Sequence, residues 1–254
     1  QEVTESNRKE RNSGASNHPV DVDSAIAKRA AAKLEEGNVK GAIRLLCSNN
    51  TIASPNLDSF TKLSALHPPV PEDHRVVAST DCIPLSASCD DIRKAVQSFP
   101  NGSAGSFDGL RPQHLKDLLG IKSTDNNLIE NITSLINLIL AGKVPELVRP
   151  TLFGGALTAL NKKDGGLRPI VVGNTWRRLA AKVACRHVYE RCAEFLAPRQ
   201  LGFGVSGGAE AAAHAARRYI QSMDSNKVFM KIDFSNAFNT LRRDVILCAI
   251  KTNF

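Results

Sequence analysis

Hydrophobic residues in the first 142 positions recur mostly at helical spacing. A stripe of apolar residues with a three- or four-residue repeat predicts an amphipathic helix. The helix predicted over 88–99 is the best defined, because Ser88 or Asp90 can cap its start and an apolar stripe follows: Ile92, Ala95, Val96 and Phe99. Pro, Ser and Asn dominate 54–88, which predicts loop with short helical turns. The same periodicity predicts further helices over 22–36, 39–48, 111–119 and 126–142.

Strand patterns enter after residue 150. The segments TLFGGALTAL and LRPIVVG are joined by NKKDGG, and Asp-Gly-Gly is a strong hairpin signal. The apolar segment KVFMKIDF, at 227–234, predicts a further, buried strand. Helices are predicted between and after these strands, over 175–196, 209–223 and 236–250. The elements together predict the α+β fold class, with a helix-rich N-terminal part.

Three regions are expected along the chain. Residues 1–20 are polar and lack periodicity, so we expect a disordered tail. Residues 21–87 are expected to form a helical and loop region, and 88–254 a larger region with both strands and helices. The sequence begins at Gln1 and stops at Phe254 without a closing element, from which we expect a piece of a longer protein.

Charge is distributed unevenly between the two parts of the chain. Residues 151–254 hold 16 Lys and Arg against 7 Asp and Glu, a net charge of +9, whereas residues 1–150 hold 17 against 18. A basic region of this kind favours a polyanionic partner. A solvated basic face without a ligand is the alternative.

The six cysteines form no CxxC pair, and no His stands at zinc-finger spacing. We therefore expect buried thiols in a reducing compartment, rather than a metal centre or disulfides. No apolar stretch is long enough to span a bilayer and no signal peptide is present, so the expected location is the nucleus or the cytoplasm.

The predicted hairpin carries a candidate phosphate site. Lys162 and Lys163 lie at its strand end or turn and Arg168 lies on the returning strand. A hairpin brings its two strands within about 5 Å of each other. An ammonium group and a guanidinium fork can converge there on one phosphate. The alternative is a solubilising turn, because lysine is common at exposed hairpins.

Asp233 ends the apolar segment over 227–234 and is the candidate metal ligand. Mg²⁺ in proteins is held by one or two carboxylates together with substrate phosphate oxygens. Phe238 follows in the next predicted helix, where an aromatic ring could lie against a sugar. The alternative for Asp233 is a helix N-cap, a position where Asp is favoured.

Several segments resemble reverse transcriptases of non-LTR, LINE-like retrotransposons. KIDFSNAFN resembles motif A, LNKKDGGLRPIVVG resembles the fingers hairpin, and QLGF resembles the turn between fingers and palm. GSAGSFDGLRPQHLK resembles a Gly-x-Asp-Gly segment near the start of these enzymes. These segments occur over residues 88–254 in the same order as in the family. The resemblance therefore implies that 88–254 is a partial reverse transcriptase domain. The implied fold is an incomplete right-hand polymerase, fingers and the start of the palm, preceded by a helical N-terminal region.

The resemblance also implies roles for individual residues. Asp233 would be a catalytic ligand of Mg²⁺, aided by the backbone carbonyl of Phe234, and Phe238 would be the steric gate. Lys162, or its neighbour Lys163, and Arg168 would hold the triphosphate of a deoxynucleotide. The implied partners are an RNA template and a DNA primer, whose backbones would contact Arg177, Arg178 and Lys182.

The family carries a later aromatic-x-Asp-Asp motif, and no Asp-Asp follows Asp233 in this sequence. We therefore expect a piece of an RNA-directed DNA polymerase that is inactive as this chain. The alternative is a non-catalytic nucleic-acid-binding module, in which the basic half holds RNA and Asp233 is only a cap. A protein-interaction domain in the first 150 residues is a third reading.

Overall fold

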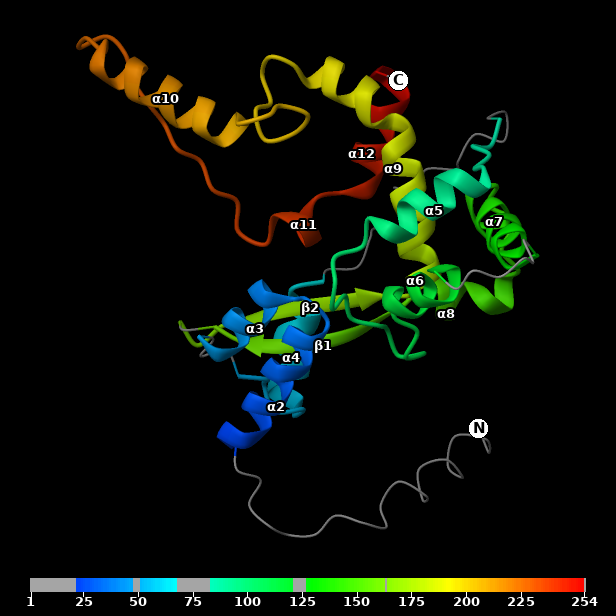
Figure 1. Cartoon of the computed structure of the whole chain (residues 1–254). Helices are drawn as coiled ribbons and strands as arrows, with labels where there is room; N and C mark the ends of the chain where they lie inside the picture. The colour runs from blue at the N-terminus through cyan, green and yellow to red at the C-terminus, as the bar shows by residue number, and fades with distance from the viewer. Residues whose placement is uncertain (1–21, 48–50, 68–82, 121–126, 163, 254) are drawn as a thin grey trace. The chain divides into compact units, whose positions relative to one another are not determined.

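The computed structural model describes residues 22–47, 51–67, 83–120, 127–162 and 164–253, apart from the side chains of 22–25 and of Phe238. The chain forms two compact units, Gln1–Asn49 with Pro100–Gly102 and Asn50–Phe99 with Ser103–Phe254 (Figure 1). The tail expected over 1–20 lies outside the described residues, and the boundary expected between 87 and 88 stays a prediction.

The first unit is a helical hairpin of α2 (Val22–Glu35) and α3 (Val39–Leu46), which confirms the helices predicted there. Gly37 turns the chain with a φ of 71°, in the left-handed region that glycine adopts without steric cost. Asn38 then caps α3, because its side-chain oxygen accepts a hydrogen bond from the N–H of Gly41 at 2.9 Å. Ala30 and Ala42 are buried in this unit.

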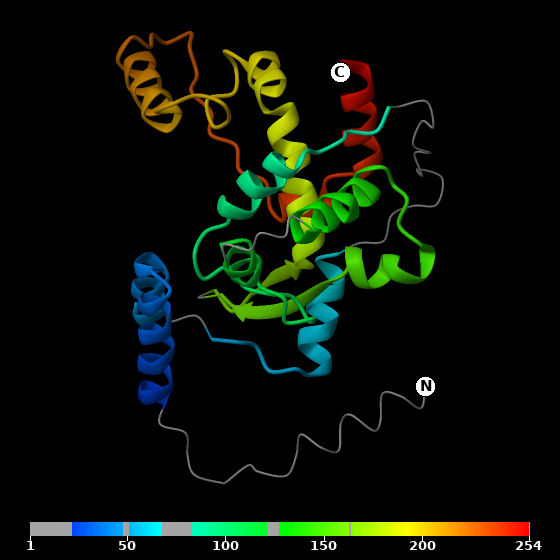
Figure 2. The same ribbon diagram turned by 45° about the vertical axis from the view of Figure 1, so that its right-hand side comes forward.

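The second unit has a helical core made by α5 (Cys89–Gln97), α6 (Pro112–Gly120), α7 (Asn127–Leu140) and α9 (Thr175–Leu196). Figures 1 and 2 show α5, α7 and α9 side by side. The predicted apolar stripe is confirmed, since Ile92, Ala95, Val96 and Phe99 are all buried. They pack in one cluster with residues from the other helices, among them Leu115, Ile132, Ile136, Leu179 and Val183.

A capping box begins α5. The Ser88 hydroxyl accepts a hydrogen bond from the Asp91 N–H at 3.2 Å, and the Asp91 carboxylate accepts one from the Ser88 N–H at 2.9 Å. Of the two cap residues predicted, Ser88 is therefore the one that caps the helix. α4 (Leu57–Ala65) lies within the segment predicted as loop with helical turns, and its helix is longer than a turn.

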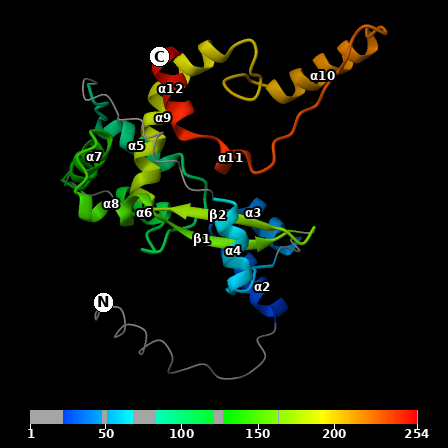
Figure 3. The same cartoon turned by 180° about the vertical axis from the view of Figure 1, so that it is seen from behind.

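The predicted hairpin is confirmed as β1 (Gly155–Asn161) and β2 (Leu167–Gly173), which pair antiparallel. Residues 51–53 run along the other side of β1, where the Ala53 N–H donates to the Ala159 oxygen at 2.9 Å. α4 packs against β2, as Figure 3 shows. The strand predicted from residue 151 starts later than expected, because η2 (Glu146–Val148) and α8 (Arg149–Phe153) precede it and Pro150 favours a helix start.

A glycine-rich loop follows α9 and turns back on it. Gly204 has a φ of 72° and its Cα lies against Ala193 of α9, while the Phe203 ring contacts the Tyr189 ring with centroids 5.0 Å apart. The loop ends at Gly208, the buried first residue of α10 (Gly208–Gln221), whose Cα lies against the Leu201 carbonyl oxygen. The helix predicted over 209–223 is therefore confirmed.

The strand predicted over 227–234 is wrong. These residues have no regular secondary structure, and Val228, Met230 and Phe234 are 81%, 74% and 73% exposed. A strand needs a neighbour for its N–H and C=O groups, and among the described residues only β1, β2 and 51–53 supply strand pairing. The helix predicted next is interrupted at Leu241, giving α11 (Ala237–Thr240) and α12 (Arg243–Asn253).

The prediction that the thiols are buried is also wrong for the part of the chain that the structure describes, although the five cysteines there are free thiols. Cys47, Cys185 and Cys248 are exposed, and Cys89 and Cys192 are half-buried. Cys89 packs against the helical core, whereas the three exposed thiols lie on faces that no other described element covers, so a thiol's preference for burial is not met there. Cys82 lies outside the described residues. In the described residues no helix combines the length and the apolar character needed to cross a membrane.

Candidate nucleotide and nucleic-acid site

The hairpin places two of the predicted phosphate ligands on one face. Arg168 is opposite Leu160 in the β1–β2 register, and cross-strand partners point to the same side of a sheet. Lys162 stands two residues beyond Leu160, and its N–H continues the ladder by donating to the Gly166 oxygen at 2.8 Å. Lys162 and Arg168 are therefore diagonal neighbours on one face, about 7–8 Å apart at their backbones.

Both side chains are exposed, and neither has an ion pair or a hydrogen bond within the described residues. Asp164 is the acid nearest in sequence, and its carboxylate instead accepts from the Gly166 N–H at 3.0 Å. The tip of the hairpin therefore carries two cationic groups that an anion can reach. Lys163 lies outside the described residues.

α9 begins directly after the hairpin and carries the predicted nucleic-acid contacts. Asn174 caps the helix, because its side-chain oxygen accepts from the Trp176 N–H at 2.9 Å. In the first turn, the Arg177 guanidinium lies over Gly173, which has no Cβ to obstruct it. Arg177 is half-buried in this position.

Arg178 and Lys182 are one turn apart on α9 and both lie against the ring of Phe99. The Arg178 guanidinium carbon is 5.3 Å and the Lys182 ammonium nitrogen 4.8 Å from the ring centroid. Lys182 also donates to the Ser98 hydroxyl at 3.1 Å. A cation at this place is favoured by the ring and by the negative C-terminal end of the α5 dipole.

Burial lowers the pKa of Arg178, and the nearby charge of Arg177 lowers it further. A guanidinium nevertheless stays charged at any physiological pH, and its five donors exceed the bonds it makes here. The structure thus gives Arg178 and Lys182 partners inside the protein that sequence reasoning missed. Their contact with a nucleic-acid backbone stays a prediction, as does that of Arg177.

Asp233 lies in the irregular segment before α11, with its side chain exposed. Asn236 occupies the N-cap position of α11, so the interpretation of Asp233 as a helix cap is wrong. Asn236 has a φ of 51°, and its side-chain amide donates to the Leu66 oxygen at 2.9 Å. Asn is one of the few non-glycine residues that adopt this conformation readily. Phe234 is exposed beside Asp233, and Phe238 belongs to α11 although its side chain is outside the description.

The described residues hold no group of three or more His, Cys, Asp or Glu side chains that could bind a metal ion. Asp233 is joined to the hairpin by no hydrogen bond or ion pair in the described ranges. The structure thus shows no bond that brings Asp233 together with the other predicted site residues in the part of the chain that it describes.

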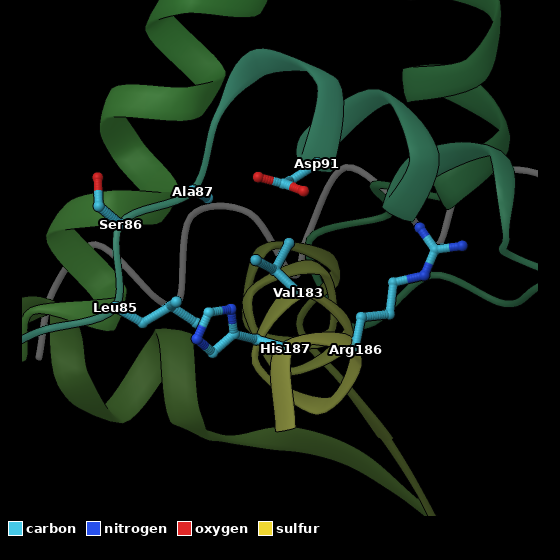
Figure 4. A pocket seen from close by; sticks show the side chains of 7 residues that line it. All are labelled: Leu85, Ser86, Ala87, Asp91, Val183, Arg186 and His187. Carbon is cyan, nitrogen blue, oxygen red and sulfur yellow. The ribbon is translucent and has the colours of Figure 1, made fainter. Parts of the chain in front are cut away.

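Sequence reasoning missed a cavity between α5 and α9, with a volume of about 130 Å³. Figure 4 shows Asp91 of α5 on one side and His187 and Arg186 of α9 on the other, with Val183 between them. Hydrogen bonds from the Ser88 side chain and backbone lower the pKa of Asp91, against the opposite effect of burial. The sequence contains a signal for the position of Arg186. It follows Lys182 by four residues, as Lys182 follows Arg178, and residues four apart lie on one face of a helix.

Comparison with known proteins finds one distant similarity. No family model matches the chain, and no solved structure matches it. Over 190 residues, 74% of the chain, it is 26% identical to the retrotransposable element SLACS 132 kDa protein of Trypanosoma brucei gambiense. The matched part is 15% of the length of that protein. This similarity relates the chain distantly to a protein of a retrotransposable element.

Proposed function

We propose that the chain forms the fingers and the start of the palm of an RNA-directed DNA polymerase of a non-LTR retrotransposon. Its partners in that role are an RNA template, a DNA primer and deoxynucleoside triphosphates. The observation that carries the proposal is the β1–β2 hairpin, on which Lys162 and Arg168 share one exposed face. The distant similarity to a retrotransposable-element protein supports the same origin.

The chemistry of the hairpin tip fits a triphosphate. Arg168 offers a planar fork for two phosphate oxygens, and Lys162 adds a point charge from the adjoining strand. Neither side chain has an acidic partner among the described residues that an incoming anion would have to displace. The basic start of α9 continues the positive charge toward the base of the hairpin, where a nucleic-acid backbone would bind.

The two-ion Mg²⁺ site implied by the resemblance does not fit the described residues. Asp233 is a single carboxylate, and among the described residues it belongs to no group of three or more His, Cys, Asp or Glu side chains that could hold a metal ion. We derive no catalytic step through a metal ion, and we propose that the 254-residue chain does not polymerise. Primer extension on poly(rA)/oligo(dT) with Mg²⁺ tests this, because robust incorporation of dTTP by the purified chain would contradict it.

Titration calorimetry of dTTP into the purified chain at low salt tests the hairpin site. A hydrogen bond to a charged group is worth about 1.5–3 kcal/mol, so Arg168→Ala is expected to weaken binding roughly tenfold to a hundredfold. Lys162→Ala is expected to weaken it by a smaller factor. Arg217→Ala removes an exposed arginine of α10 and serves as the matched control. Equal losses in Arg168→Ala and Arg217→Ala would contradict a specific site.

A non-catalytic nucleic-acid-binding module is the second candidate, and the exposed, isolated Asp233 favours it. Binding of RNA and of dTTP, each measured by calorimetry, separates the two functions. The module predicts that the original chain binds RNA but not dTTP. The polymerase-derived hairpin site predicts dTTP binding that Arg168→Ala weakens.

A further inference from the structure

The base of the β1–β2 hairpin is attached to a segment far from it in sequence. The Ser106 hydroxyl donates to the Val172 carbonyl oxygen at 2.9 Å. The side-chain amide of Asn174 donates to the Asp108 carboxylate, also at 2.9 Å. These two bonds fix the last residues of β2 and the residue that joins β2 to α9.

Two further bonds hold the first turns of α9 to the same segment. The Thr175 hydroxyl donates to the Leu110 carbonyl oxygen, and the Arg178 guanidinium donates to the Ala104 carbonyl oxygen, each at 2.6 Å. The bonded residues of this segment are Ala104, Ser106, Asp108 and Leu110. They alternate along the chain, so one edge of residues 104–110 faces the hairpin base and the start of α9. We call residues 104–110 the brace segment.

The contact is buried and its shape is constrained. Asn174 and Thr175 are only 4% and 0% exposed, so water cannot easily replace the bonds that they make. Gly105 has no room for a side chain, since a Cβ there would lie 2.8 Å from the Leu110 oxygen. Gly109 has a φ of 72°, which disfavours other residues. The segment therefore holds one conformation against the hairpin base.

The hairpin turns any change at its base into a larger displacement at its tip. Asn174 is six positions from Arg168 along the chain, a length of about 20 Å at 3.3 Å per residue. A rotation of about 10° at Asn174 would move Arg168 by about 3.5 Å, which exceeds the length of a hydrogen bond. The direction in which Lys162 and Arg168 present their charges thus depends on how firmly the base is held, as well as on the pairing of β1 with residues 51–53 near the tip.

We propose that Asp108 and Asn174 are positioning residues for the anion-binding face of the hairpin. Their hydrogen bond sets the angle between β2 and α9 and so aims Lys162 and Arg168 at one triphosphate. The choice of a triphosphate as the ligand rests on the proposed function. The attachment of the hairpin base to the brace segment is tested without a ligand, by hydrogen exchange.

The first test compares dTTP affinity in the full chain, by calorimetry at low salt. Asp108→Ala removes the acceptor for Asn174 and is expected to weaken binding about tenfold. Asp108→Asn keeps an acceptor oxygen and is expected to bind within about threefold of the original chain. If Asp108→Asn loses affinity as Asp108→Ala does, the carboxylate itself is required and positioning by this hydrogen bond is overturned.

A variant in another part of the helical core separates positioning from general destabilisation. Asn137 of α7 accepts from the Ala87 N–H at 2.8 Å and donates to the Ala87 oxygen at 3.1 Å, away from the hairpin. Asn137→Ala therefore lowers stability without freeing the hairpin base, and dTTP affinity is expected to be retained. An equal loss of affinity in Asn137→Ala and Asp108→Ala would show a purely structural role and overturn the proposal.

Amide hydrogen exchange over residues 170–178 tests, without any ligand, whether the brace segment holds the hairpin base. Asp108→Ala is expected to speed exchange there at least tenfold, and Asp108→Asn to leave it within threefold. Unchanged exchange in Asp108→Ala would overturn the brace. If the original chain binds no dTTP while exchange responds as expected, the proposed function at the hairpin fails and the brace stands.

Ser106→Ala provides a milder variant should Asp108→Ala not fold. It removes one bond to Val172 and leaves the buried Asn174 paired. The expected result is a smaller effect, about threefold, on both dTTP affinity and exchange over 170–178. Affinity and exchange identical to those of the original chain would count against the brace.

Discussion

The helical core of α5, α6, α7 and α9 and the C-terminal stretch from α10 to α12 have comparable apolar content but different burial. In the core, Ile92, Ile136 and Leu179 are completely buried. In the stretch, Ile232 and Ile250 are 63% and 51% exposed, and α12 has no buried residue. Apolar sequence therefore does not make a core unless other elements cover it, and the two regions should differ in stability as they do in burial.

Amide hydrogen exchange should separate the two regions most strongly. Amides of α7 are expected to be protected about a thousandfold or more, because exchange there requires opening of the core. Amides of 227–234 have no strand partner and are expected to exchange nearly as fast as those of an unstructured peptide. Strong protection over 227–234 would contradict the expected difference between the two regions, since it would mean that this segment is hydrogen-bonded to another strand.

Matched isoleucine substitutions give the next largest difference. Ile136→Ala leaves a cavity in the core and is expected to lower the free energy of unfolding by about 2–5 kcal/mol. Ile232→Ala removes an exposed side chain and is expected to change it by less than about 0.5 kcal/mol. Urea denaturation followed by circular dichroism measures both, and similar losses in the two variants would refute the difference in burial.

The capping box of α5 sharpens the comparison, because α11 has no side-chain cap. Ser88→Ala is expected to cost about 1 kcal/mol of unfolding free energy. Ser235→Ala, beside the N-cap position of α11, is the matched serine substitution and is expected to have no measurable effect. An equal cost at both positions, measured by urea denaturation, would indicate that the stretch is as well ordered as the core.

Acid should produce the smallest effect, and we expect it at the capping box of α5. Hydrogen bonds from Ser88 lower the pKa of Asp91 from 3.8, so its contribution to stability is complete above about pH 4 and is lost as the pH falls through the lower folded value. Asp91→Asn is expected to remove this part of the acid dependence. Urea midpoints measured between pH 2 and 7 test it, and identical acid limbs in both proteins would contradict the assignment.

Features that depend on neighbouring residues could be predicted from the sequence. The stripe ending at Phe99, the cap at Ser88 and the Asp-Gly-Gly hairpin all follow from local spacing and turn chemistry. The shared face of Lys162 and Arg168 follows from the hairpin register. Local patterns were sufficient here because each element is completed by residues close to it in the chain.

Features that depend on distant contacts could not be predicted. The segment 227–234 has the composition of a buried strand, yet a strand also needs a partner, which composition does not reveal. Asp108 and Asn174 are 66 positions apart, and nothing in either local sequence indicates their bond. The contacts of Arg178 and Lys182 with Phe99 were missed for the same reason, because they exist only once α5 and α9 have packed.

The contact of Gly208 with the Leu201 carbonyl has a consequence for how this sequence can vary. Every other amino acid carries a Cβ, which would collide there with backbone rather than with a side chain that could move aside. Substitution at Gly208 is therefore expected only together with a change in the length or path of 201–208. Among natural or selected variants, those that keep the length of the loop 201–208 should also keep glycine at position 208, so the two features should be inherited together.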